Sequence, residues 1–140
     1  MAAARCAAMM CAMQRTRTDI LCYYDARVGT SIYGGVFNPL TLEPFPLYYA
    51  FVAFNELYKL GEMATCSHAN SDGIYILAAA SDAHKAVLVA NESDRDVPIR
   101  TNLGAEMKAS VINDTLRLEP TNVNASDFTI PQGTVILFKA

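Results

Sequence analysis

The chain has 140 residues, of which 52% are hydrophobic and 18% are charged, and its formal net charge is -3. It has no basic run and no apolar run of about 18 residues, so the sequence predicts neither a nucleic-acid ligand nor a membrane span. The length suits one ordinary domain, and the apolar composition indicates either a large core or surface meant for a partner.

The first segment, residues 2–14, consists almost entirely of strong helix formers with alanine dominant, and its apolar residues surround the predicted helix. Arg5 and Arg15 interrupt this apolar start and no clean cleavage site follows, so we expect a cytoplasmic chain, with export as an open alternative. Residues 19–25 then predict a strand. Their run Ile20–Tyr24 is continuously apolar, which is typical of a strand buried on both faces in a parallel sheet.

A long loop over residues 25–46, rich in glycine and proline, is predicted next. Loops of this length in a compact domain are usually either functional or wrongly assigned as loops. Residues 46–60 then place Phe, Leu and Tyr side chains at helical spacing. Pro46 suits the first turn of this helix and Gly61 suits its C-cap.

After Gly61 the hydrophobic period changes from about 3.6 residues to 2. Strands are predicted over residues 62–67, 73–80, 84–91, 97–103, 110–118 and 127–138. Turn residues separate these short strands, which favours an antiparallel β-sandwich. The strand over 84–91 is apolar on both faces, so we expect it at the centre of its sheet. The predicted fold class is therefore α+β, with a helix–strand–helix unit over 1–61 and a small antiparallel sandwich over 62–140.

The cysteines show no C-x-x-C spacing, and neither histidine lies at metal-ligand spacing from them. They are Cys6, Cys11, Cys22 and Cys66. We therefore expect no metal and no cofactor. We interpret Cys6 and Cys11, which lie among Ala and Met, as small buried apolar residues, and the cysteine usage fits a reducing compartment.

Three motifs stand out in the N-terminal part of the chain: YYDAR (Tyr23–Arg27), SIYGGVFN (Ser31–Asn38) and YYAFVAFNELYKLG (Tyr48–Gly61). They resemble the end of a retaining glycoside hydrolase of family 39 or of a related bacterial (β/α)8 glycosidase, a group with xylosidase- and arabinosidase-like members. The closing FTIPQGTVILFKA resembles the last strand of the sandwich in these enzymes. The resemblance implies that residues 1–61 are a barrel remnant, with the last barrel strand at 19–25, and that both catalytic glutamates lie N-terminal to residue 1.

The resemblance also implies a fragment that is inactive on glycosides alone, because retaining hydrolysis needs two carboxylates about 5–5.5 Å apart. Carbohydrate is the expected partner. The implied sugar-binding residues are Tyr24, Asp25, Arg27, Tyr33 and Asn38. Asp25 and Arg27 are also open to interpretation as a structural ion pair that caps a strand, and the sequence favours this interpretation. A barrel remnant would expose apolar surface, so we expect a homo-oligomer through the N-terminal elements.

Two other functions stay open. A carbohydrate-binding module would suit the sandwich, although Tyr75, Phe128 and Phe138 are the only aromatic residues after residue 61. A small esterase-like hydrolase would need a Ser/His/Asp site, although no G-x-S-x-G motif is present. The residues available for such a site are Ser81, Asp82, His84 and His68.

Overall fold

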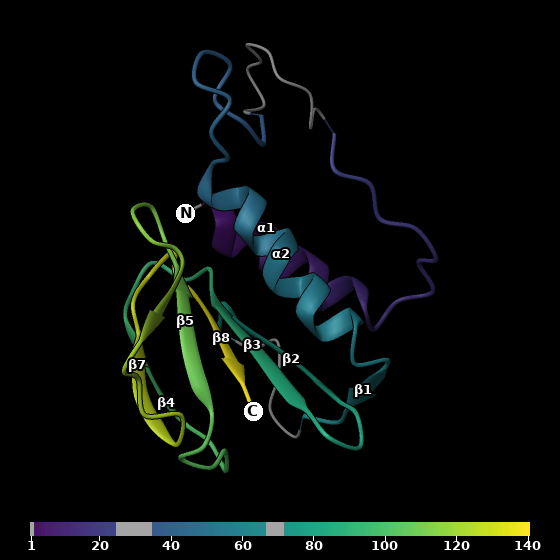
Figure 1. The fold of residues 1–140 in the computed structure, drawn as a ribbon, viewed down its shortest axis with the longest axis vertical. Coiled ribbons are helices and arrows are strands. Elements are labelled where there is room, and N and C mark those ends of the chain that lie inside the picture. The colour runs from purple at the N-terminus through teal and green to yellow at the C-terminus, as the bar shows by residue number, and fades with distance from the viewer. Residues whose placement is uncertain (1, 25–34, 67–71) are drawn as a thin grey trace.

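The computed structural model describes residues 2–24, 35–66 and 72–140. Its elements are α1 (Ala2–Met13), α2 (Pro46–Tyr58), β1 (Glu62–Ala64), β2 (Ile74–Ala80), β3 (Lys85–Asn91), β4 (Val97–Arg100), β5 (Lys108–Ile112), β6 (Arg117–Thr121), β7 (Asp127–Ile130) and β8 (Val135–Lys139). They form three layers, with the two helices on one face of a six-stranded sheet and a two-stranded sheet on the other face (Figure 1). The predicted α+β class and antiparallel sandwich are confirmed.

The large sheet has the strand order β1-β2-β3-β8-β5-β6, and β4 pairs with β7 in the small sheet. Every pairing is antiparallel. The last strand, β8, lies between β3 and β5, so the C-terminal end of the chain closes the middle of the sheet. The strand predicted over 84–91 is β3, and it lies inside the sheet as expected because both of its faces are buried.

Alternate residues of β8 serve the two cores of the protein, because side chains along a strand point to opposite faces. Val135 and Leu137 belong to the core beneath the helices, whereas Ile136 and Phe138 belong to the core between the two sheets. All four are at most 2% exposed. In the second core Phe138 packs against Phe128 of β7, with ring centroids 5.1 Å apart.

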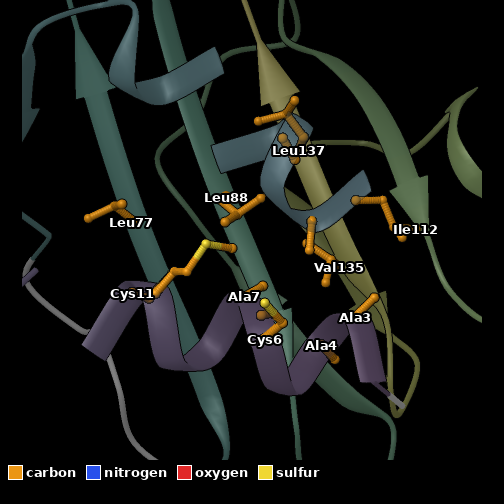
Figure 2. Packing of buried hydrophobic residues seen from close by; sticks show 14 of the residues in the cluster. Ala3, Ala4, Cys6, Ala7, Cys11, Leu77, Leu88, Ile112, Val135 and Leu137 are labelled. Atoms are coloured by element: carbon orange, nitrogen blue, oxygen red, sulfur yellow. The ribbon is translucent and has the colours of Figure 1, made fainter. Parts of the chain in front are cut away.

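The helices pack on the large sheet through small side chains. In α1, Ala3, Ala4 and Ala7 are at most 2% exposed, and Figure 2 shows them beneath Leu88 and Val135 of the sheet. In α2, the fully buried Ala50 and Ala53 are the corresponding residues. Because these side chains are small, each helix can pack close to the sheet. The high helix propensity of alanine also stabilises α1 itself. No helix in the described part of the chain is long and apolar enough to cross a membrane.

The helix predicted over residues 46–60 is confirmed and ends at Tyr58. Pro46 occupies its first turn, and Gly61 follows the helix end with φ +87°, a backbone conformation that glycine adopts without strain. Tyr58, one of the aromatic residues at helical spacing, is 78% exposed.

The predicted strand over residues 19–25 is wrong over its described part. Residues 19–24 are irregular, and Ile20 and Tyr24 are 79% and 73% exposed. A doubly buried strand needs a hydrogen-bonded neighbour, and none of the described strands pairs with this segment. Residues 25–34 of the predicted loop lie outside the described residues, and the rest of that loop closes through a bridge between Phe37 and Pro44.

Two predicted strands are each divided by a turn. The segment 110–118 contains the end of β5 and the start of β6, because the Asn113 side chain accepts the backbone N–H groups of Thr115 (2.9 Å) and Leu116 (2.8 Å). The segment 127–138 contains β7 and β8, separated by a turn in which Gly133 has φ +67°. Asparagine side chains and left-handed glycines both favour turns over continued strands.

Candidate functional site

The sugar-binding residues implied by the resemblance fall between positions 24 and 38 of the sequence, and only two of them are among the described residues. Asp25, Arg27 and Tyr33 lie outside the described residues, and Tyr24 is the last residue before that gap. Asn38 is half-buried, and its Oδ1 accepts the backbone N–H groups of Leu40 (2.9 Å) and Thr41 (3.2 Å). The side-chain oxygen of Asn38 therefore stabilises the turn over residues 38–41.

The residues considered for an esterase site lie largely in one turn. Ser81, Asp82 and His84 are all exposed in the hairpin between β2 and β3, whereas His68 lies outside the described residues. The Ser81 hydroxyl bonds to the main chain of His84, accepting its N–H at 3.2 Å. An activated serine instead needs its hydroxyl bonded to the imidazole. The hydrogen bonds between the Ser81 hydroxyl and the His84 main chain therefore close a hairpin and do not activate a nucleophile.

The aromatic residues considered for a sugar-binding platform are mostly internal. Phe128 is 8% exposed and Phe138 is fully buried, and both pack between the two sheets. Tyr75 is half-buried against the helix-side core. A platform for sugar rings requires exposed aromatic faces, which Phe138 does not provide.

An apolar groove of about 390 Å³ lies along the helix pair, and none of its lining residues comes from the sheet. Met9 of α1, Leu21 and Cys22 line it together with Phe51 of α2. Tyr23 packs edge-on against Phe51, with ring centroids 5.7 Å apart. The groove is therefore a feature of the outer side of the helices. The sequence indicated apolar surface on these elements but not its position.

The polar groups around the groove are few. Arg5 Nε lies 3.0 Å from Glu92 Oε1, and this pair is exposed at the rim. Burial raises the pKa of the Cys6 thiol to about 11, so this thiol is protonated and unreactive at neutral pH. Among the described residues, no cluster of three or more His, Cys, Asp or Glu side chains is arranged to hold a metal ion.

The second cleft, of about 580 Å³, lies where the end of α2 meets the ends of β3, β5 and β8. Glu56 lies at its edge, with Oε1 2.8 Å from Lys59 Nζ and Oε2 2.9 Å from Lys139 Nζ. The hydrogen bonds from Lys59 and Lys139 hold the pKa of Glu56 below its ordinary value. The carboxylic acid that protonates the leaving group in a glycosidase needs a raised pKa, so Glu56 is unsuited to that catalytic role.

No protein-family model matches the sequence, and no curated protein matches it significantly. Solved structures match its fold. A glycoside hydrolase family 30 subfamily 8 xylanase from Clostridium acetobutylicum gives a TM-score of 0.75 at 16% identity, over 98% of this chain and 38% of its own. A family 30 endoxylanase from Clostridium papyrosolvens gives 0.71 at 13% identity, over 99% and 37% respectively. A glucosidase from Croceicoccus marinus gives 0.71 at 13% identity, over 98% and 41%.

These identities are too low to carry function, but the fold agreement extends over nearly the whole chain. The chain spans 37% to 41% of the length of these solved structures. Two of them belong to family 30, whereas the motifs in the sequence resemble family 39. The chain therefore has the fold of part of a glycoside hydrolase.

Proposed function

We propose that this chain is a non-catalytic part of a glycoside hydrolase, in which the helices and the sandwich support a catalytic barrel. The observation that carries the proposal is the fold match to a family 30 xylanase over 98% of this chain but only 38% of the enzyme. Xylose-containing glycosides are the substrates we assign to the whole enzyme, because two of the matched structures are xylanases and the sequence motifs resemble xylosidase-like enzymes.

The chemistry of the described residues supports a non-catalytic role. Retaining hydrolysis needs one carboxylic acid and one carboxylate facing each other across the sugar, and the acid needs a raised pKa. Glu43, the acidic residue of the described part of the loop before α2, is exposed. Glu56 is engaged by two ammonium groups. We therefore expect the isolated chain to release no sugar from glycosides.

The apolar groove on the helices is where we place the remainder of the enzyme. Met9 and Leu21 are 52% and 42% exposed beside Phe51, and such grouped apolar side chains mark an interaction surface. When the chain is produced alone, a second copy takes that place, because burying the same apolar atoms is favourable whichever chain supplies the cover.

The activity test is an assay of the purified chain on xylan and on nitrophenyl β-xyloside and β-glucoside, with a family 30 xylanase as the positive control. We expect no turnover by this chain. Sequencing the DNA upstream of Met1 completes the test, because the proposal requires an open frame encoding further strand–helix units with two glutamates at strand ends. Glycoside turnover by the chain alone, or an upstream stop codon in every frame, would overturn the proposal.

The association test is the molar mass by light scattering during size exclusion. Met9→Glu places a charge in the groove and should give a monomer, whereas the wild-type chain should give a dimer or larger species. Met63→Glu is the matched control, because Met63 is 59% exposed on β1 and does not line the groove. A monomeric wild-type chain at high concentration, or equal dissociation by both variants, would contradict the assignment of the groove.

A further inference from the structure

Three Asn-x-Ser/Thr triplets occur in the β-rich half of the chain, at Asn91, Asn113 and Asn124, and none of them has proline in the middle. This triplet is the acceptor sequence for attachment of a sugar to an asparagine side chain. In each triplet the asparagine Oδ1 accepts the backbone N–H and the hydroxyl of the Ser or Thr two residues later. The three sites therefore share their sequence pattern and their local turn.

The sites differ in the accessibility of Nδ2, the atom that receives the sugar. Asn91 is 0% exposed, and its Nδ2 donates to the carbonyl oxygens of Arg95 and Ile130. Asn124 is exposed, and Asn113 is half-buried. Within the described ranges, no hydrogen bond engages Nδ2 of Asn113 or Asn124. Two of the three amide nitrogens are therefore uncommitted in the folded chain.

The two uncommitted sites lie on either side of β6 along the chain. Asn113 is in the turn between β5 and β6, and Asn124 is in the connection from β6 to β7. β6 is an edge strand of the large sheet, and an unpaired strand edge is a template for pairing with another molecule. Bulky hydrophilic groups at both ends of β6 would oppose such pairing. Neither asparagine lines the groove on the helices or the second cleft, so sugars here leave both open.

We propose that Asn113 and Asn124 are acceptor sites for N-linked sugar and that Asn91 stays unmodified in the folded chain. The donor is an activated sugar phosphate, either a nucleotide-linked hexose or an oligosaccharide linked to a lipid pyrophosphate. Asparagine Nδ2 forms a bond to the anomeric carbon and releases one proton. The bond from that carbon to the phosphate oxygen breaks, and the phosphate group leaves with the electron pair. The proposal is independent of the glycoside hydrolase assignment.

The first arm of the test incubates the purified chain with UDP-glucose and a soluble N-glycosyltransferase that recognises Asn-x-Ser/Thr. Tandem mass spectrometry then locates the added hexose. We expect hexose at Asn113 and Asn124. The rate at Asn91 should be roughly a hundredfold lower, because access to a buried side chain at the end of a core strand requires the structure to open.

A tryptic digest supplies the unfolded control. Cleavage after lysine and arginine places the three asparagines on separate peptides, 86–95, 109–117 and 118–139. In the digest Asn91 should be modified as readily as the other two asparagines, because no tertiary structure covers it. The second arm secretes the chain from a eukaryotic host, which supplies the lipid-linked donor, and detects glycans by release with a peptide N-glycosidase.

Thr115→Ala and Ser126→Ala are matched variants, because each removes one acceptor triplet and leaves the other intact. Each variant should lose sugar only at its own asparagine. Modification in the first arm alone supports a nucleotide-linked donor, and modification in the second arm alone supports a lipid-linked one. If Asn113 or Asn124 of the folded chain stays unmodified in both arms, or if Asn91 of the folded chain reacts as fast as they do, the proposal is wrong.

Discussion

Replacing Asn91 with alanine removes a fully buried polar side chain at the end of β3. Its Nδ2 donates to the carbonyl oxygens of Arg95 (2.8 Å) and Ile130 (3.0 Å). Its Oδ1 accepts the backbone N–H (2.9 Å) and the hydroxyl (2.6 Å) of Ser93. One amide thus ties β3 to the following turn and to β7 of the second sheet, so Asn91→Ala tests how the two sheets are held together.

Asn124 offers a matched control with the same local turn. Its Oδ1 accepts the backbone N–H (3.1 Å) and the hydroxyl (2.8 Å) of Ser126, two residues later, as Asn91 does with Ser93. Asn124 is exposed, whereas Asn91 is 0% exposed. The difference between Asn91→Ala and Asn124→Ala therefore isolates the buried donor bonds of Asn91.

The expected magnitudes follow from the bonds that each substitution removes. Loss of the exposed turn in Asn124→Ala should cost about 1 kcal/mol of unfolding free energy. Asn91→Ala loses an equivalent turn, and the two buried donor bonds raise the expected cost to about 3 kcal/mol. In Asn91→Ala the Ser93 hydroxyl loses its acceptor, Asn91 Oδ1, and can donate instead to the carbonyl oxygen of Arg95, 3.0 Å away, so that carbonyl is not left unsatisfied.

Urea denaturation followed by circular dichroism measures both free energies of unfolding. A cost of about 3 kcal/mol is a large fraction of the 5–15 kcal/mol that stabilises a typical domain, so the midpoint should shift clearly. Equal costs for the two variants, within about 0.5 kcal/mol, would refute the claim that the buried amide joins the sheets.

Two further predictions concern titratable groups. Lys59 and Lys139 hold the pKa of Glu56 below its ordinary value of 4.5, so its contribution to stability is complete above that pH and lost as the pH falls through the lowered pKa. Glu56→Gln should therefore reduce the fall in melting temperature that the wild-type chain shows as the pH is lowered below 4.5. An unchanged dependence of melting temperature on pH would contradict this prediction. Burial raises the pKa of Cys11 to about 12, so iodoacetamide should label the exposed Cys22 first, and equal labelling by mass spectrometry would count against it.

The elements with local signals were predicted best. The alanine-rich composition of residues 2–14 predicted α1, and the helical spacing after Pro46 predicted α2. The doubly apolar strand at 84–91 was correctly expected inside a sheet. These signals depend on neighbouring residues alone, because helix propensity and side-chain periodicity act over a few positions.

Errors arose where a turn interrupted a β-rich run or where a strand needed a distant partner. Asn113 and Gly133 were available as turn signals within segments interpreted as continuous strands. Residues 19–24 have the composition of a buried strand, but no described strand pairs with them. Backbone hydrogen bonding between strands depends on residues far apart in the sequence. Composition alone therefore predicts strands in segments that have no pairing partner.

The candidate sites likewise include one that was predicted from local motifs and one that only the fold revealed. The motif resemblance predicted residues around the loop before α2, and of these the described Asn38 supports a turn through its side chain. The cleft at the end of α2 was not predicted, because its lining residues lie far apart in the sequence. The pairing of β8 with β3 and β5 is what places Lys139 beside Lys108.

The sequence by itself determined the two helices, the β-rich C-terminal half and the apolar character of the N-terminal elements, because each follows from composition and period over short windows. The tertiary structure decided that β8 closes the centre of the large sheet, that Asn91 joins the two sheets, and that Lys108 and Lys139 lie directly opposite each other. These three outcomes depend on strand order and register, which are set by contacts between residues far apart in the chain.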